Sequence, residues 1–189
     1  MADPVFYLVS VAQVPVAVLN RETNAEKALE KSHEVKHGLD GKTSSAWLFQ
    51  SNPVLYDLRG ALRSHAEQVW SVSRYAKEIR TGDRVYLWEA GSQGGIAAIA
   101  EIIEPASLQP ELSEQIKFAR VAEAFQGERL RARLRILQVI EPVLDRKSIV
   151  TCPGLNELAV LRCPRGTNFR LTLNEWHALN GLIHGTATT

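Results

Sequence analysis

The sequence predicts an α+β fold, a small mixed β-barrel flanked by helices, and three observations predict it. Between positions 46 and 105, short runs rich in β-branched and aromatic residues alternate with turn residues. Residues 128–137 alternate between charged and apolar side chains with a period of two, which indicates a half-buried strand. Helical start signals stand nearer the two ends, at about residues 24 and 173.

Length and composition fit one domain with an appendage. The chain has 189 residues, 45% of them hydrophobic and 23% charged. We expect an N-terminal extension at 1–45, a main domain at 46–184 and a disordered tail at 185–189. The extension reads as an extended segment at 6–19, a charged helix at 24–37 and a linker at 40–45.

Charge and cysteine usage limit the classes of partner. A net charge of +1 means that a nucleic acid would have to be held by a local basic face. The only two cysteines, Cys152 and Cys163, suit a reducing cytoplasm; two buried thiols are the favoured interpretation and a single bridge the alternative. No apolar run reaches membrane-spanning length. We expect a soluble, cytoplasmic protein with no membrane partner, metal or cofactor.

One catalytic motif falls in the N-terminal helix. His33-Glu34-Val35-Lys36-His37 matches H-E-x-x-H, whose spacing puts two imidazoles on one helical face to bind zinc. The competing interpretation is a solvated helix end, where histidines complement the helix dipole. The helix is polar nearly all round, whereas a catalytic zinc helix is packed into a core. A zinc hydrolase therefore stays the minor alternative.

The central stretch divides into short elements. We expect strands at 47–50, 69–72, 83–89 and 96–103, a helix at about 55–65, and a glycine-rich hairpin loop at 89–95. The glycines of that loop allow positive φ or a close backbone approach to a ligand. They join two strands, so neither a P-loop nor a dinucleotide fingerprint fits.

The C-terminal part predicts a helix at 110–126, a short apolar strand at 158–163 and a final helix at 173–184. Thr172 and Glu175 form a capping box at the start of that final helix. Trp176 lies on its apolar face, so we expect it in the core.

Three of the four tryptophans lie where a strand meets a polar or glycine-rich loop. They are Trp47, Trp70 and Trp88. Flat aromatic walls with hydrogen-bonding groups between them suit a planar base, although tryptophan in a small barrel is usually core. For Trp47, at the start of a buried strand, we favour the core. For Trp70, beside Ser71 at a strand opening, we favour a pocket.

Four arginines follow the period-two pattern of the strand at 128–137. They are Arg129, Arg131, Arg133 and Arg135, and they are predicted to share one face. At about 6.6–6.8 Å apart on a strand, they could track a phosphate backbone. The alternative is a solvated face neutralised by carboxylates of a neighbouring strand. The sequence alone favours neither the phosphate-binding interpretation nor the neutralised face.

Several motifs together resemble one family. They are Trp47-Leu48-Phe49-Gln50-Ser51-Asn52-Pro53, Trp70-Ser71, Gly82-Asp83-Arg84-Val85 and the run from Gly95 to Glu101. This combination resembles the EVE domain, a member of the PUA-like superfamily and a relative of the YTH readers of methylated adenine in RNA. The family pattern at the first strand is Trp-Leu-Phe-Lys-Ser-Glu-Pro, so Gln50 and Asn52 depart from it. The Gln-Ser-Asn-Pro variant is most similar to EVE domains of prokaryotic modification-dependent restriction systems.

The resemblance implies a PUA-like barrel with a pocket for one flipped, modified base. By position, Trp70 matches the cage tryptophan, Ser71 the polar group beside it, and Asn52 a residue that contacts the edge of the base. The remaining candidates are Gln50 and Ser51 beside Asn52, Trp88 with Gly91 and Ser92 as the other wall, and Asn168 and Phe169 in a loop that approaches the pocket.

The function that the resemblance implies is binding without catalysis. The first hypothesis is a reader of a modified base, modified cytosine in DNA above all, with any nuclease or restriction subunit on another chain or a missing portion. The second is an RNA-modification reader of the PUA-like class. The third is an enzyme, either the zinc hydrolase through His33 and His37 or a base-processing activity. No catalytic site is expected beyond that zinc motif.

Overall fold

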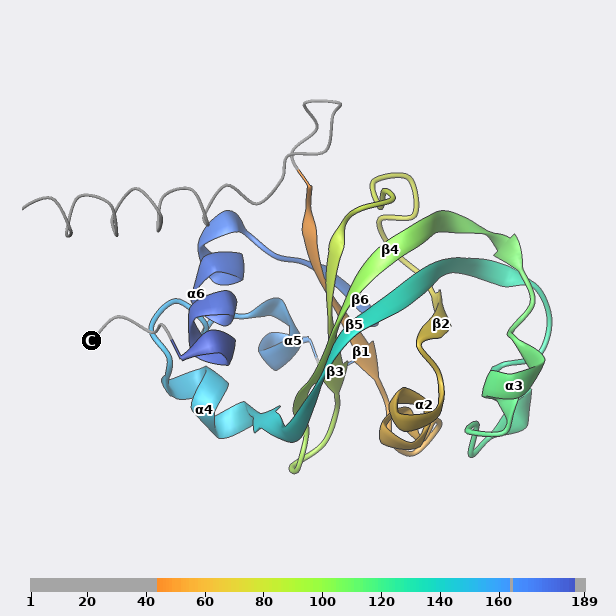
Figure 1. The fold of residues 1–189 in the computed structure, drawn as a ribbon, viewed down its shortest axis with the longest axis horizontal. Coiled ribbons are helices and arrows are strands. Elements are labelled where there is room, and N and C mark those ends of the chain that lie inside the picture. Colours follow the sequence, from red (N-terminus) through yellow and green to blue (C-terminus); the bar gives the residue numbers. More distant parts are fainter. Residues whose placement is uncertain (1–43, 164, 186–189) are drawn as a thin grey trace, which may run out of the picture. The chain divides into compact units, whose positions relative to one another are not determined.

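The computed structural model describes residues 44–163 and 165–185. Its centre is a six-stranded mixed sheet in the order β2-β5-β4-β3-β1-β6 (Figure 1). The strands are β1 (Ala46–Ser51), β2 (Glu67–Ser71), β3 (Arg84–Glu89), β4 (Gly95–Gln109), β5 (Arg129–Asp145) and β6 (Asn168–Arg170). The helices are α2 (Leu58–Ser64), α3 (Ser113–Ile116), η2 (Ala122–Ala124, a 3₁₀ turn), α4 (Arg146–Thr151), α5 (Ala159–Arg162) and α6 (Leu173–His184).

The sheet is curled but is not a closed barrel. β1 and β3 are parallel, and the other neighbouring pairs are antiparallel. Repeated register shifts between β4 and β5 bend these two long strands, as β-bulges do. In the described residues, the edge strands β2 and β6 form no backbone ladder with each other, and the Asn168 side-chain Nδ2 donates to the Ser71 carbonyl across this seam at 3.2 Å. The predicted α+β class is confirmed, and the barrel is open at this seam.

Each face of the sheet carries a hydrophobic cluster. Because side chains alternate along a strand, Trp47 and Phe49 of β1 enter one cluster and Leu48 enters the other. The first cluster includes Leu58 of α2 and the buried face of β2. The second lies under α4, α5 and α6, which cover the opposite side of the sheet (Figure 1). Both faces are thus buried around β1 and β3.

Asp83 fixes the start of β1 beside β3. Its carboxylate accepts the Trp47 indole N–H at 2.8 Å, the Ser45 backbone N–H at 2.9 Å and the Arg80 backbone N–H at 2.9 Å. Trp47 is fully buried, so its indole N–H needs this partner. The prediction that Trp47 belongs to the core is therefore confirmed.

We expect Asp83→Asn to lower the free energy of unfolding by about 1–3 kcal/mol, the usual penalty for a buried polar group left without its partner. An asparagine keeps the shape but presents an NH₂ group to at least one of the three donors. Urea denaturation of both proteins measures the difference. An exposed control, Glu157→Gln, removes one charge from a residue that makes no contact in this cluster, and it is expected to leave stability unchanged within about 0.5 kcal/mol. Equal stability of Asp83→Asn and the natural protein would contradict the expectation.

Two sequence-based elements are wrong. The helix expected at 110–126 is reduced to α3 and η2, because this segment wraps over the pocket face and bonds to β2. There the Gln115 side chain accepts the Val69 N–H at 3.0 Å and donates to the Glu67 carbonyl at 3.2 Å. The strand expected at 158–163 is the short helix α5. A short apolar run of this length does not distinguish a strand from a buried helical turn.

The final helix agrees with its prediction. α6 spans Leu173–His184, and Thr172 and Glu175 make the reciprocal hydrogen bonds of a capping box. Trp176 is half-buried and packs against the second cluster. The expectation of two buried thiols is wrong, because Cys163 is exposed and Cys152 half-buried, and both are free.

The predictions about zinc, other metals and the membrane can be compared only with the part of the chain that the structure describes. His33, His37 and the helix at 24–37 lie outside the described residues. Within residues 44–163 and 165–185, no group of three or more His, Cys, Asp or Glu side chains has the geometry to hold a metal ion. In the same part of the chain, no helix is long and apolar enough to cross a membrane.

Candidate functional site

A pocket of about 430 Å³ opens on the side of the sheet that carries the first hydrophobic cluster. This volume lies in the range of about 300–1,000 Å³ that small-molecule sites occupy. Four segments build it: the end of β1 with the turn after it, strand β2, the wrapping segment at 111–129, and the loop before β6. The lining residues are Gln50, Ser51, Asn52, Leu55, Tyr56, Gln68, Val69, Trp70, Ser71, Glu111, Ala124, Phe125, Arg129, Arg165, Gly166 and Thr167.

The walls of the pocket are aromatic. Trp70 lines it while remaining only 8% exposed, and Phe49 supports the indole from the core at a centroid distance of 6.2 Å. Tyr56 and Phe125 also line the pocket, with their rings 5.4 Å apart and inclined at 39°. These rings come from three separate segments, so the folded chain holds them before any ligand arrives. Such a wall suits a flat, aromatic ligand.

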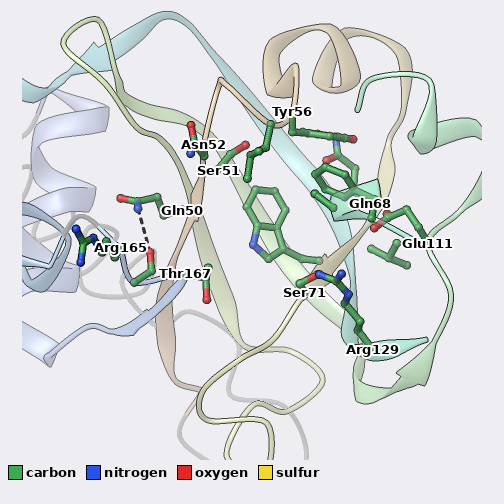
Figure 2. Close-up of a pocket in the computed structure, with 16 residues that line it drawn as sticks. Gln50, Ser51, Asn52, Tyr56, Gln68, Ser71, Glu111, Arg129, Arg165 and Thr167 are labelled. Atoms are coloured by element: carbon green, nitrogen blue, oxygen red, sulfur yellow. Dashed lines mark hydrogen bonds between the residues drawn. The ribbon is translucent and has the colours of Figure 1, made fainter. Parts of the chain in front are cut away.

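One group of polar residues lies where β1 ends. Figure 2 shows Gln50, Ser51 and Asn52 on the same side of the pocket as Arg165 and Thr167. The Gln50 Nε2 group donates to the Gly166 carbonyl at 3.0 Å, which ties β1 to the loop before β6. Asn52 accepts the Val54 N–H through its side-chain oxygen at 3.0 Å, a local turn typical of asparagine. The amide NH₂ of Asn52 is then the part that a ligand can meet.

A second polar group lies on the other side of the pocket, where Figure 2 shows Tyr56, Gln68 and Glu111. Burial raises the pKa of Glu111, and the neighbouring Arg131 guanidinium opposes that rise. Burial also raises the pKa of Tyr56, and the Glu111 carboxylate adds to the effect. Tyr56 is therefore a neutral hydroxyl at physiological pH, able to donate or accept a hydrogen bond.

Arg131 anchors the segment that carries Glu111 and Phe125. Its side chain is fully buried, and its Nε donates to Glu111 Oε2 at 3.1 Å. Its Nη1 donates to the backbone carbonyls of Gln109 and Gly127, and its Nη2 donates to that of Phe125. One side chain thus ties the two ends of the wrapping segment together. Arg131 positions two pocket residues without lining the pocket itself.

The structure brings half of the sequence-based candidates together. Gln50, Ser51, Asn52, Trp70 and Ser71 all line the pocket. Trp88, Asn168, Phe169, Gly91 and Ser92 do not, and for these five the expected placement is wrong. The reasons differ, and each follows from the strand or turn that carries the residue.

Trp88 and Phe169 point into the second cluster, on the opposite side of the sheet. Trp88 is two residues beyond Tyr86, so strand alternation places both on that side. Asn168 is 1% exposed and used structurally: its Oδ1 accepts the Ser73 N–H at 2.9 Å while its Nδ2 binds the Ser71 carbonyl.

The hairpin loop between β3 and β4 also serves the fold. A Cβ at Gly95 would lie 2.0 Å from the Leu144 carbonyl oxygen, and one at Gly94 would lie 2.0 Å from the Glu89 carbonyl oxygen. The glycines thus allow strands to approach one another. Gly91 has φ of +104°, the left-handed region that favours glycine.

The arginines of β5 do not share one exposed face. Arg131 is fully buried, because the wrapping segment covers it and accepts its hydrogen bonds at Glu111, Phe125 and Gly127. Arg133 lies near the carboxylates of Glu67 and Glu104, and Arg135 near Glu67. These pairs match the alternative in which neighbouring carboxylates neutralise the strand. Arg129 is exposed and lines the pocket. The expectation of four aligned, accessible arginines is wrong for Arg131.

Sequence reasoning missed several lining residues. Gln68 stands two residues before Trp70, so the strand period alone could have placed it on the same face. Arg165 lies three residues before Asn168, in the loop that the sequence resemblance brings to the pocket. Tyr56, Glu111 and Phe125 lie in a turn and an irregular segment, where no period links them to the pocket. Only tertiary packing brings these three to the site.

A curled mixed sheet with α4, α5 and α6 on one side, and with α2 and an aromatic-walled pocket on the other, agrees with the PUA-like architecture that the motifs imply. The EVE-domain family model matches residues 45–182, most of the chain. The chain therefore belongs to the EVE-domain family, and the resemblance seen in its motifs is confirmed. No curated protein sequence matches it.

Solved structures share the fold at low sequence identity. A hypothetical protein from Leishmania major is 15% identical with a TM-score of 0.56, over 77% of this chain and 98% of that one. A protein from Rhodopseudomonas palustris is 19% identical with a TM-score of 0.55, over 77% and 96%. Human THYN1, in complex with DNA containing 5-methylcytosine, is 15% identical with a TM-score of 0.52, over 74% and 97%.

Proposed function

We propose that this protein is a nucleic-acid reader that holds one flipped, modified base in the pocket around Trp70, with modified cytosine in DNA as the first ligand. The observation that carries the proposal is the pocket itself, in which Trp70, Tyr56 and Phe125 supply flat walls and polar side chains stand at both sides. THYN1, which shares the fold, was solved with DNA containing 5-methylcytosine, so that base is the first to test.

The energies involved are of the right size for such a site. Taking a base out of the duplex stack costs a few kcal/mol. Stacking on an aromatic side chain returns about 1–3 kcal/mol per base. A buried methyl group adds about 0.8 kcal/mol. Further affinity must come from polar matching inside the pocket and from the phosphate backbone.

Two cationic side chains at the pocket suit the phosphates on either side of a flipped nucleotide. Arg129 and Arg165 both line the pocket and are exposed, from different segments. Each phosphate contact makes binding weaker as salt rises. Of the arginines predicted from the strand pattern, Arg133 and Arg135 remain secondary candidates, because carboxylates already lie beside them.

The proposal assigns no catalytic group to this chain. A reader acts by locating a base, so a nuclease or restriction subunit would work from another chain in the same cytoplasm. RNA carrying a modified base is the alternative ligand, and it enters the same experiment as a competing probe.

The test is a fluorescence-anisotropy titration of the full chain with labelled oligonucleotides. The panel holds cytosine, 5-methylcytosine, 5-hydroxymethylcytosine, adenine or N6-methyladenine at one position, each in duplex DNA and in single-stranded RNA. Tighter binding to one modified cytosine in DNA supports the proposal. Preference for a modified base in RNA would transfer the reader function to RNA. Equal affinity for every probe, or none up to millimolar protein, contradicts it.

Asn52→Ala is expected to weaken binding of the preferred probe about two- to tenfold, the equivalent of one hydrogen bond of about 0.5–1.5 kcal/mol. Asn52 is exposed at the mouth of the pocket, so its loss should leave folding intact. Ser92→Ala is the matched control, since Ser92 is an exposed loop residue outside the pocket. Identical affinities of these two variants would show that Asn52 makes no contact with the ligand.

A further inference from the structure

The side-chain amide of Gln68 is buried, and its NH₂ group has no hydrogen-bond acceptor in the described residues. Its side chain lines the pocket and is only 1% exposed. Among the residues that the structure describes, its Nε2 has no hydrogen-bond partner. A buried donor left unsatisfied costs about 1–3 kcal/mol, and such groups in folded proteins usually have a role. A donor of this kind that faces a cavity points to a ligand acceptor.

Glu111 supplies the complementary group on the same side of the pocket (Figure 2). Its side chain is 6% exposed, and Arg131 Nε occupies one of its oxygens at 3.1 Å. A carboxylate has room for about four hydrogen bonds, so the group can accept from a ligand while it remains paired with Arg131. Gln68 and Glu111 together offer one N–H donor and one charged acceptor.

A reader of methylated cytosine faces a specific chemical problem. Thymine carries the same methyl group at C5 as 5-methylcytosine and stacks on aromatic walls in the same way. The two bases differ only along one edge, where 5-methylcytosine has an N4 amine and an unprotonated N3, and thymine has an O4 carbonyl and an N3–H. Shape and apolar contact therefore cannot separate the intended base from one that all DNA contains.

We propose that Gln68 and Glu111 are the residues that read this edge, with Glu111 accepting from the N4 amine and Gln68 donating to N3 of a cytosine-type base. The inference rests on the proposed function and adds the specificity of the same site. Acceptance of the cytosine N4 amine by a carboxylate is an established pairing in base recognition. The ligand class is then a pyrimidine with a 4-amino group.

Glu111 also rejects the wrong base. With thymine in the same place, the O4 carbonyl would face the carboxylate, two acceptors with no proton between them. Discrimination is strongest when the wrong ligand leaves buried polar groups unpaired, as this one would. Gln68 contributes less to rejection, because its amide can turn and present its oxygen to N3–H.

The test uses two DNA duplexes that differ only at one base, 5-methylcytosine or thymine, each opposite an abasic site so that no base pair must be broken. The full-length protein is expected to bind the 5-methylcytosine duplex at least about tenfold more tightly, a difference of about 1.4 kcal/mol. Glu111→Gln keeps the size of the side chain and an oxygen for Arg131, but its NH₂ can donate to O4. We expect this variant to gain affinity for thymine and to lose most of the preference.

Glu157→Gln is the control for charge, because Glu157 is exposed and pairs with Arg162 rather than lining the pocket. Its preference should equal that of the natural protein. A preference retained in Glu111→Gln, or equal binding of both duplexes by the natural protein, overturns the edge-reading inference while the reader function stands. Failure of the natural protein to bind either duplex overturns the reader function itself.

Gln68→Met gives an independent measurement that does not depend on Glu111. Methionine has a similar length and no donor, so it removes an unsatisfied buried group, and thermal stability should stay level or rise. Binding of the 5-methylcytosine duplex should nevertheless weaken about tenfold. Opposite effects on stability and affinity are the signature of a ligand-binding group. Unchanged affinity in Gln68→Met would overturn the role given to Gln68.

Discussion

Replacing Arg131 with alanine is expected to lower the free energy of unfolding by about 3–5 kcal/mol, the usual loss when one partner of a buried ion pair is removed. The guanidinium is fully buried and donates to the Glu111 carboxylate and to three backbone carbonyls. Alanine leaves all of these acceptors without their donor. Urea denaturation of both proteins at neutral pH measures the loss directly.

The matched control is Arg135→Ala on the same strand. Arg135 is exposed and lies 3.8 Å from the Glu67 carboxylate, so its pair is worth about 0–1 kcal/mol. A loss below about 1 kcal/mol for Arg131→Ala would mean that the buried pair contributes no more than an exposed one. Since Arg131 positions Glu111 and Phe125, Arg131→Ala should also bind the preferred oligonucleotide more weakly. Arg135→Ala removes the same positive charge and is the control for that loss of affinity.

The deficit of Arg131→Ala should depend on pH in a defined direction. Burial raises the pKa of Glu111, and Arg131 is the group that lowers it most. Without Arg131 the raised pKa moves further up, so the unfolded state loses this proton at a lower pH than the folded state. The free energy of unfolding of the variant therefore falls as pH rises from the ordinary glutamate pKa of about 4.3 to the raised pKa of the folded state. It recovers as pH falls back toward about 4.3. We expect the difference in stability to be smaller at pH 5 than at pH 7.5, as parallel denaturation curves would show.

Elements whose signals are local could be predicted from the sequence. The capping box of Thr172 and Glu175 starts α6 at the expected residue, because both partners lie within one turn. The strands around the central glycine-rich hairpin agree for the same reason, since turn residues bound each one. The helix expected at 110–126 is broken into α3 and η2, because Gln115 bonds to the backbone of β2 and Arg131 binds the Phe125 and Gly127 carbonyls. Contacts between distant segments override a local apolar pattern there.

The site residues also separate into those that local motifs predict and those that only tertiary contacts bring together. Trp70, Ser71 and the Gln50–Asn52 turn could be proposed from motifs, because each motif keeps neighbouring residues together. The prediction for Trp88 is wrong, because the neighbouring glycine-rich loop indicates a ligand site while the strand period places Trp88 with Tyr86 on the opposite face. Glu111 and Phe125 needed the folded chain, since a buried arginine on another strand brings them to the pocket. The specificity that we assign to Glu111 was therefore out of reach of the sequence alone.

Trp70→Ala is expected to weaken binding of the preferred oligonucleotide by about 1–3 kcal/mol, the contribution of one aromatic stack. The same change should lower the free energy of unfolding by about 3–5 kcal/mol, because Trp70 is 8% exposed and packs against Phe49 in the first cluster. Affinity is measured by anisotropy of labelled DNA, which does not rely on the tryptophan removed. Stability is measured by urea denaturation, and binding is compared only at temperatures where the variant is folded.

A pair of milder variants separates the pocket from the core. Trp70→Phe and Trp88→Phe make the same chemical change at two buried tryptophans, one lining the pocket and one in the second cluster on the opposite side of the sheet. Both should lose some stability, since each leaves a smaller ring in a packed site. Only Trp70→Phe should weaken binding, because only its ring meets the ligand. Equal loss of affinity in both would mean that binding follows overall stability. Trp70 would then be a core residue that makes no contact with the base.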